Sequence, residues 1–300
     1  MRALAILLSV LSLFSCTRSD KPSSVSIVAV DFPSYDAARA LCGDSVTLLL
    51  PPGTEIHSYE PTPKDMIAIS NADAIILIGG ESEEWVYSIL GSMEGEKNVF
   101  ALMEHVDTLD EELKEGMEGE EEEDAEKDEH VWTSPVNEMR IISSLSLFLS
   151  RIMPDEKDDI ERRADDYISQ LADIDREIRS VVSSSRLDTL IFASRFPFRY
   201  FTEEYGLDYY AAFPGCAEET EPSARTIAFL IDKARELGVN YILRTEFSSS
   251  AIPSLIASEA GCSVLEFHSV HNLASDDFMK GETYVTLMRR NIDVLREALK

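Results

Sequence analysis

Short apolar runs alternate with helix-like segments along the chain, and this alternation restricts the fold more than any other feature of the sequence. The clearest runs cover residues 25–30, 46–50, 74–78, 189–193, 241–243 and 264–267. Runs of this kind, bounded by Gly, Pro, Ser and Asp, indicate buried parallel strands in β/α units. The sequence therefore predicts an α/β protein with its strands in two groups.

One long amphipathic segment separates the two groups of strands. Its apolar residues recur at alternating spacings of four and three: Ile160, Ala164, Tyr167, Leu171, Ile174, Ile178 and Val181. This spacing predicts a helix with one buried face. We expect the helix to cover residues 154–185 and to join an N-terminal lobe at 25–153 to a C-terminal lobe at 186–300. A coiled-coil arm of a dimer is the alternative, but the heptad repeat is short, so we expect a monomer.

The first 24 residues carry the features of an export signal. Within residues 1–16, Arg2 precedes an uncharged apolar run that is shorter than the roughly 20 residues needed to span a bilayer. The run ends in Leu-Phe-Ser-Cys, which resembles the lipobox of bacterial lipoproteins and implies a lipid anchor at Cys16, with residues 17–24 as a tether. A buried N-terminal helix is the alternative. We expect an exported protein, attached to the membrane of the bacterial cell envelope by lipid alone, in the periplasm or on the outer face.

The chain is strongly acidic, with 56 Asp and Glu against 27 Lys and Arg and a formal net charge of −29. Such a chain repels phosphate backbones, so we expect no nucleic-acid partner, whereas a cation suits the charge. Residues 110–129 alone hold 13 carboxylates and two lysines. This composition predicts a solvated, disordered loop. Weak collection of hard cations is the alternative, because the stretch lacks the spacing of an EF-hand.

Three cysteines follow the lipobox: Cys42, Cys216 and Cys262. One disulfide is permitted outside the cytoplasm, but the sequence does not determine which two cysteines would pair. None of them is spaced as in a CxxC motif, so we expect no zinc cluster built on thiolates.

Several side chains with metal-binding or charged groups follow the ends of predicted strands. His57 comes after the run at 46–50, His268 directly follows the run at 264–267, and Arg195 and Glu246 follow two other runs. His130 begins a helix just after the acidic stretch. Ligand sites of open α/β sheets lie outside the carboxyl ends of the strands. Three neutral imidazoles suit zinc, so these histidines indicate a metal site shared by both halves.

Two of these histidines lie in motifs that resemble those of a known family. Residues 51–63, Pro-Pro-Gly-Thr-Glu-Ile-His-Ser-Tyr-Glu-Pro-Thr-Pro, resemble the first ligand motif of the zinc/manganese substrate-binding lipoproteins of ABC transporters. Residues 129–135, Glu-His-Val-Trp-Thr-Ser-Pro, resemble their second motif, and the acidic stretch lies where the family carries a His- or acid-rich loop. Residues 194–201 and 267–272 correspond to the segments that hold the remaining ligands.

The resemblance covers nearly the whole chain after the tether and implies both a fold and a function. The fold is a pair of lobes, each a small parallel sheet flanked by helices, joined by one long rigid helix. The function is to bind Zn²⁺ outside the cytoplasm, between the lobes, and to deliver it to an ABC permease.

Arg195 departs from the family pattern, because it stands where a His or Glu ligand is usual. A guanidinium has no lone pair to donate, so Arg195 cannot bind a cation. The site could consist of His57, His130 and His268 completed by water or by Glu246, with Arg195 beside the ligands. Alternatively, Arg195 pairs with Glu246, or tight metal binding has been lost. We favour the first interpretation, because His268 preserves three nitrogen ligands.

Zinc is the expected ion, since manganese prefers more oxygen ligands, although Mn²⁺ is the alternative. His105 and His271 are not expected to bind the ion; His271 is expected to form hydrogen bonds near it. We expect no enzymatic activity. A zinc-dependent hydrolase with Glu246 as the base is one alternative, but the chain has no HExxH motif. A surface adhesin or scaffold that uses its acidic loop is the other.

Overall fold

The computed structural model describes residues 25–54, 56–93, 95–119, 126–217 and 221–300. The predicted signal peptide, the lipobox with Cys16 and the tether lie outside these residues. Within the described ranges, no helix combines the length and the apolar character needed to cross a membrane.

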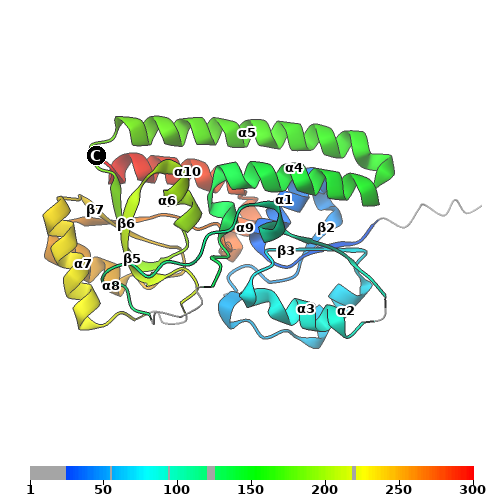
Figure 1. Ribbon diagram of the computed structural model, residues 1–300, viewed down its shortest axis with the longest axis horizontal. Helices are drawn as coiled ribbons and strands as arrows, with labels where there is room; N and C mark the ends of the chain where they lie inside the picture. The colour runs from blue at the N-terminus through cyan, green and yellow to red at the C-terminus, as the bar shows by residue number, and fades with distance from the viewer. Residues whose placement is uncertain (1–24, 55, 94, 120–125, 218–220) are drawn as a thin grey trace, which may run out of the picture.

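The described strands form two parallel sheets, one in each lobe (Figure 1). The N-terminal sheet has the order β2 (Val46–Leu48), β1 (Ile27–Ala29), β3 (Ala74–Leu77) and β4 (Asn98–Ala101). The C-terminal sheet has the order β6 (Asp208–Pro214), β5 (Thr189–Phe196), β7 (Tyr241–Arg244) and β8 (Ser263–Glu266). If the strands of each lobe are numbered in chain order, the two sheets have the same strand order. The predicted two-lobe α/β fold is confirmed, and β4 and β6 add a strand to each predicted group.

Helices cover both sheets. The N-terminal lobe contains α1 (Phe32–Cys42), α2 (Pro63–Asn71), α3 (Glu84–Gly91) and α4 (Pro135–Ile152). The C-terminal lobe contains α6 (Arg199–Tyr205), α7 (Ala224–Leu237), α8 (Ala251–Ala260), α9 (Ser275–Lys280) and α10 (Tyr284–Ala298). Thr62 and Ser134 cap α2 and α4, and each cap is followed by a proline at the first helical position.

The long helix α5 (Lys157–Ser184) runs along both lobes, above α4 on one side and α10 on the other (Figure 1). Its buried residues are those of the predicted stripe: Ile160, Ala164, Tyr167, Leu171, Ile174, Ile178 and Val181. The other faces carry charge pairs such as Arg179 with Asp175. The helix thus has one buried apolar face, and its other faces are charged. This arrangement explains how a single helix packs against both lobes.

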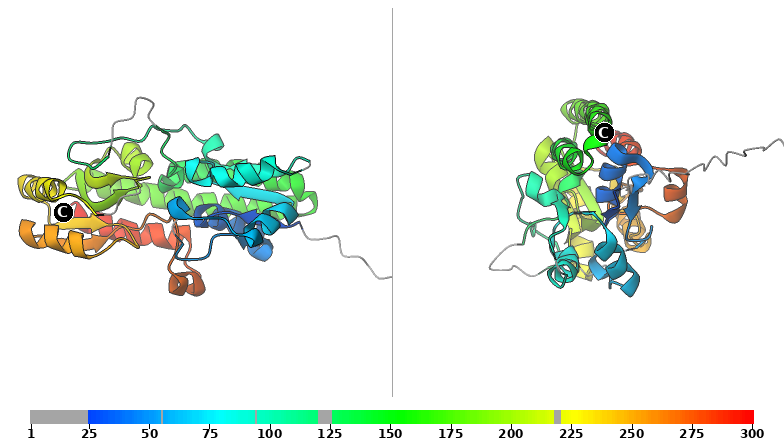
Figure 2. Two further views of the ribbon diagram at one scale, coloured as in Figure 1. Left: turned by 90° about the horizontal axis from the view of Figure 1, so that it is seen from below. Right: turned by 90° about the vertical axis from the view of Figure 1, so that its right-hand side faces the viewer.

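The flanks of the acidic stretch differ from the predicted solvated loop. Residues 106–119 cross from the N-terminal to the C-terminal lobe (Figure 2) and pack along the outer edge of β6. The backbone N–H of Glu118 donates to the carbonyl of Ala212 (2.9 Å), and the Tyr209 hydroxyl donates to Glu112 (3.0 Å). Edge strand β6 therefore offers backbone and side-chain partners that hold this flank, which composition alone does not reveal.

Candidate metal centre

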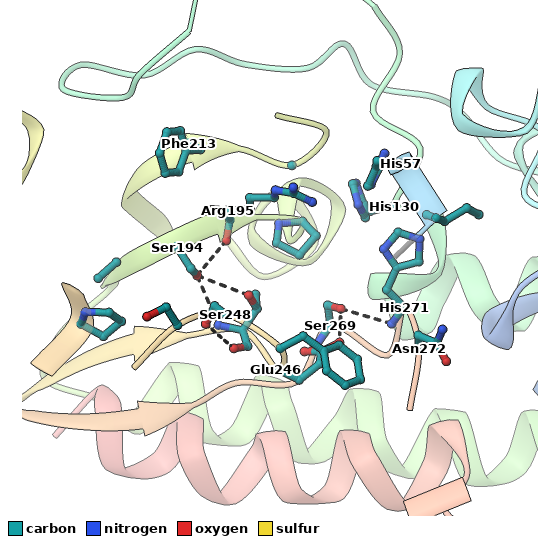
Figure 3. Close-up of a pocket in the computed structure, with 18 of the residues that line it drawn as sticks. His57, His130, Ser194, Arg195, Phe213, Glu246, Ser248, Ser269, His271 and Asn272 are labelled. Carbon is teal, nitrogen blue, oxygen red and sulfur yellow. Dashed lines mark hydrogen bonds between the residues drawn. The ribbon is translucent and has the colours of Figure 1, made fainter. Parts of the chain in front are cut away.

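Three histidines meet between the lobes: His57, His130 and His271 (Figure 3). One ring nitrogen of each lies within 4.8 Å of those of the other two. The ring centroids are 6.0 Å apart for His57 and His130, and 5.3 and 5.4 Å from each of them to His271. Imidazoles bound to one tetrahedral zinc have centroids about 5 Å apart, given Zn–N bonds of about 2.0–2.1 Å. The group therefore needs only a small contraction to hold an ion.

His57 lies in a short 3₁₀ turn, Ile56–Ser58, that follows β2 across the Pro-Pro-Gly turn. Gly53 takes a left-handed φ of 84°, which few other residues tolerate. From the other lobe, the Asn272 side-chain amide donates to the carbonyl of Thr54 (2.7 Å). Burial, the neighbouring His130 and the Arg195 charge lower the pKa of His57 to about 4. The imidazole is therefore neutral at physiological pH, the form that binds metal.

His130 is buried at the start of the 3₁₀ turn Val131–Thr133. One oxygen of Asp128 accepts from the His130 backbone N–H (2.8 Å) and lies 3.1 Å from ring Nδ1. Burial alone would lower the pKa of His130. The negative charges of Asp128 and, to a smaller extent, Glu129 have a larger opposite effect, so the pKa is raised. A carboxylate on Nδ1 leaves Nε2 for an ion and makes it a stronger donor. A Cβ on Gly215 would lie 2.9 Å from the His130 ring, so glycine permits the close approach of the C-terminal lobe.

His271 lies in the loop after β8, three residues beyond the predicted ligand. Val270 before it has a φ of 62°, a strained conformation for a β-branched residue. Within the described part of the chain, the buried Nε2 of His271 has no hydrogen-bond partner. Burial, His57 and His130 lower its pKa well below the usual value. A buried, neutral ring nitrogen without a partner is poised to bind an ion.

His268 and Glu246, which the sequence suggested as ligands, both form hydrogen bonds to the loop that carries His271. The backbone N–H of Val270 donates to Nδ1 of His268 (2.9 Å). Both oxygens of Glu246 accept from Ser269, one from its N–H (2.7 Å) and the other from its hydroxyl (2.5 Å). The left-handed turn at Val270 thus directs His271, and not His268, towards His57 and His130. No residue type in this segment signals such a turn, since valine rarely adopts it.

Arg195 lies on β5 and points towards the histidines (Figure 3). Its charge contributes to the lowered pKa values of both His57 and His271. His105 stacks on Phe100, with ring centroids 4.1 Å apart, and is not part of the group.

The histidines form one wall of a cavity of about 400 Å³. Hydroxyl side chains of the C-terminal lobe, such as Ser194 and Thr245, line part of the rest, together with apolar residues such as Phe213. The cavity therefore has room for an ion together with water.

Comparison with known proteins assigns the chain to a family. Residues 27–298 match the family described as zinc-uptake complex component A, periplasmic. The chain belongs to this family. It is 30% identical to the high-affinity zinc uptake system protein ZnuA of Bacillus subtilis over 292 residues, which cover 93% of this chain and 89% of that protein. It is 29% identical to the zinc-binding lipoprotein AdcA of Streptococcus pneumoniae, matching 99% of this chain but spanning only 61% of AdcA.

Solved structures agree with this assignment. The Zn(II)-bound ZnuA-like domain of Streptococcus pneumoniae AdcA superposes with a TM-score of 0.76 at 28% identity, over 92% of this chain and 99% of that domain. The metal-dependent lipoprotein YcdH of Bacillus subtilis gives a TM-score of 0.77 at 28% identity, with the same coverage. The resemblance to the metal-binding lipoproteins and the two-lobe fold are therefore confirmed, and the family is one of zinc-uptake components.

Proposed function

We propose that the chain binds one Zn²⁺ ion through His57, His130 and His271 and delivers it to an ABC permease for uptake. The observation that carries the proposal is the buried Nε2 of His271, which lacks a partner among the described residues and faces two other imidazoles. Two of the rings have lowered pKa values, so an ion need not displace a proton from them. Water in the cavity completes a tetrahedral set.

The donor set also bears on the choice of ion. Three imidazole nitrogens favour Zn²⁺, whereas Mn²⁺ prefers sites richer in oxygen. The nearby charge of Arg195 weakens the attraction for any cation, and the Asp128 carboxylate on His130 opposes that effect. The zinc named in the family description and in the AdcA and ZnuA relatives supports this assignment.

We propose further that the protein works as a monomer outside the cytoplasm, attached to the membrane through Cys16. The lipobox-like segment at residues 13–16 supports the anchor. AdcA of Streptococcus pneumoniae and YcdH of Bacillus subtilis are both described as lipoproteins. Incorporation of labelled fatty acid into the parent, and its loss in Cys16→Ala, would test the anchor.

Zinc titration in competition with a chromophoric chelator tests the ligand set. We expect one zinc per chain in the parent and at least tenfold weaker binding in His271→Ala, about 1.4 kcal/mol or more. His268→Ala is the matched variant: it loses an imidazole from the same loop but not from the group of three, and should be affected less. Stronger loss in His268→Ala than in His271→Ala would overturn the assignment.

A further inference from the structure

A second group of metal-binding side chains lies directly against the three histidines. It consists of His57, Glu129 and Cys216, whose ligand atoms all lie within 4.8 Å of one another. The three residues come from separate segments: the turn after β2, the residue ahead of His130, and the loop after β6. They offer nitrogen, oxygen and sulfur to one point, and this combination is typical of zinc.

The Glu129 carboxylate has a fixed place in this group. It is 3% exposed, and Ser82 donates to both of its oxygens, from the backbone N–H (2.8 Å) and from the hydroxyl (2.5 Å). A Cβ on Gly80 would lie 2.2 Å from the carboxylate carbon, so glycine leaves the room that Glu129 occupies. Each carboxylate oxygen accepts more than one bond, and lone pairs therefore remain for an ion.

Cys216 is positioned from the opposite lobe. Its backbone N–H donates to the Glu111 carboxylate (2.9 Å), which lies in the flank of the acidic stretch that crosses between the lobes. The preceding Gly215 lies against the His130 ring. Cys216 is a free thiol, and it meets its partners only through the packing of the two lobes. The absence of CxxC spacing therefore excludes a local thiolate cluster, but not this arrangement.

We propose that His57, Glu129 and Cys216 form a second position for the zinc ion beside the three-histidine site, with His57 common to both. The inference rests on the proposed function, because both positions share one ligand. When the ion moves to the second position, its bonds to His130 and His271 break and bonds to Glu129 and Cys216 form. Its bond to His57 remains. On binding, the Cys216 thiol gives up its proton to solvent and the thiolate takes the ion in its place.

The two positions would differ in what they select. A thiolate is a soft ligand that favours zinc over manganese, calcium and magnesium. The group also joins both lobes, with His57 and Glu129 on one side and Cys216 on the other. Separation of the lobes would therefore release an ion bound at the second position. The bonds to all three histidines would not have to break at the same moment.

Cobalt substitution tests the inference, because Co²⁺ bound to thiolate has a strong sulfur-to-metal charge-transfer absorption that nitrogen ligands do not give. The decisive protein is the His130→Ala/His271→Ala variant, which keeps the second group and loses the first. Under a phosphine reductant, we expect this variant to bind one Co²⁺ with the charge-transfer band. Adding Cys216→Ser should abolish the band, and adding Glu129→Gln should weaken Co²⁺ binding about tenfold.

Cys262→Ser in the same background is the matched control and should leave the band unchanged, since Cys262 donates to Val239 away from the group. Circular dichroism melting of each variant checks that it is folded. Tight binding by the parent without any band in the parent or the double variant would overturn the second position and leave the proposed function standing. A band that persists while His271→Ala leaves zinc affinity unchanged would overturn the three-histidine site instead.

Discussion

The two lobes share one order of strands but hold their histidines in different ways. In the N-terminal lobe, His130 is fixed by Asp128, two residues earlier in the chain. In the C-terminal lobe, His271 follows a strained residue, and its loop is held by Glu246 and by Trp132, whose indole N–H donates to the Ser269 carbonyl across the lobes (2.9 Å). The ring of His130 is therefore held by a residue close to it in the chain, whereas the loop of His271 is held in part by a bond from the other lobe.

The two lobes also differ in their buried acidic residues. Among the described residues, every acidic residue that is buried as a whole, backbone and side chain together, lies in the N-terminal lobe: Asp31, Asp36, Asp65, Glu83, Asp128, Glu129 and Glu138. Asp128 lies beside the His130 ring, and Glu129 is a member of the proposed second position. Glu138, in contrast, has a buried oxygen without a partner in the described chain, so ionising its carboxyl group is costly.

The largest effect is expected from removing the N-terminal ligand. His130→Ala should weaken zinc binding about 100-fold, or about 2.7 kcal/mol, because it deletes the nitrogen that Asp128 makes a strong donor. His105→Ala is the control, since His105 stacks on Phe100 outside the group. Equal zinc affinities for the two variants in a chelator competition would show that His130 is not a ligand.

The buried carboxyl group of Glu138 should make the stability of the protein depend on pH. Burial, with Asp36 and Asp31 adding to it, raises the pKa of Glu138 well above the ordinary 4.5. As the pH rises above 4.5, the unfolded chain loses this proton before the folded chain does. The free energy of unfolding then falls by about 1.4 kcal/mol per pH unit until the folded pKa is reached.

Glu138→Gln cannot ionise, so its stability relative to the parent should rise with pH above about pH 5, by up to about 1.4 kcal/mol per pH unit. Urea unfolding of the zinc-free proteins at a series of pH values measures the difference. A constant offset between the two proteins would show that Glu138 is already ionised in the folded lobe.

A smaller loss of affinity is expected from releasing the C-terminal loop. Glu246→Gln keeps the size of the side chain but places an amide against the two donors of Ser269. We expect about tenfold weaker zinc binding, as is usual for residues that orient a ligand. Glu266→Gln, which breaks only a surface pair with Arg244 (2.6 Å), should bind zinc like the parent. Full affinity in Glu246→Gln would mean that the loop needs no such support.

The smallest effect concerns the contact between the two ligand loops. Asn272→Ala removes the bond to Thr54 across the lobes and should speed zinc release about threefold in stopped-flow measurements, or about 0.7 kcal/mol. Asn98→Ala loses a comparable bond to the Asp73 carbonyl within one lobe and should leave release unchanged. Equal rates for both variants would contradict a dependence of the site on lobe packing.

The sequence was a good guide to what local patterns determine. The stripe from Ile160 to Val181 is a short-range feature, and the structure confirms it. The motifs around His57 and His130 likewise led to two members of the group. The position of His271 beside His57 and His130 could not be predicted, because it depends on a left-handed valine held by distant side chains. The docked flanks of the acidic stretch depend in the same way on the exposed edge of β6.

Diffraction at the zinc absorption edge, from crystals of the zinc-loaded protein, tests the central claim most directly. We expect an anomalous peak about 2.0–2.1 Å from one ring nitrogen each of His57, His130 and His271. A peak bonded to His268 or Glu246, with His271 turned away from it, would contradict the account.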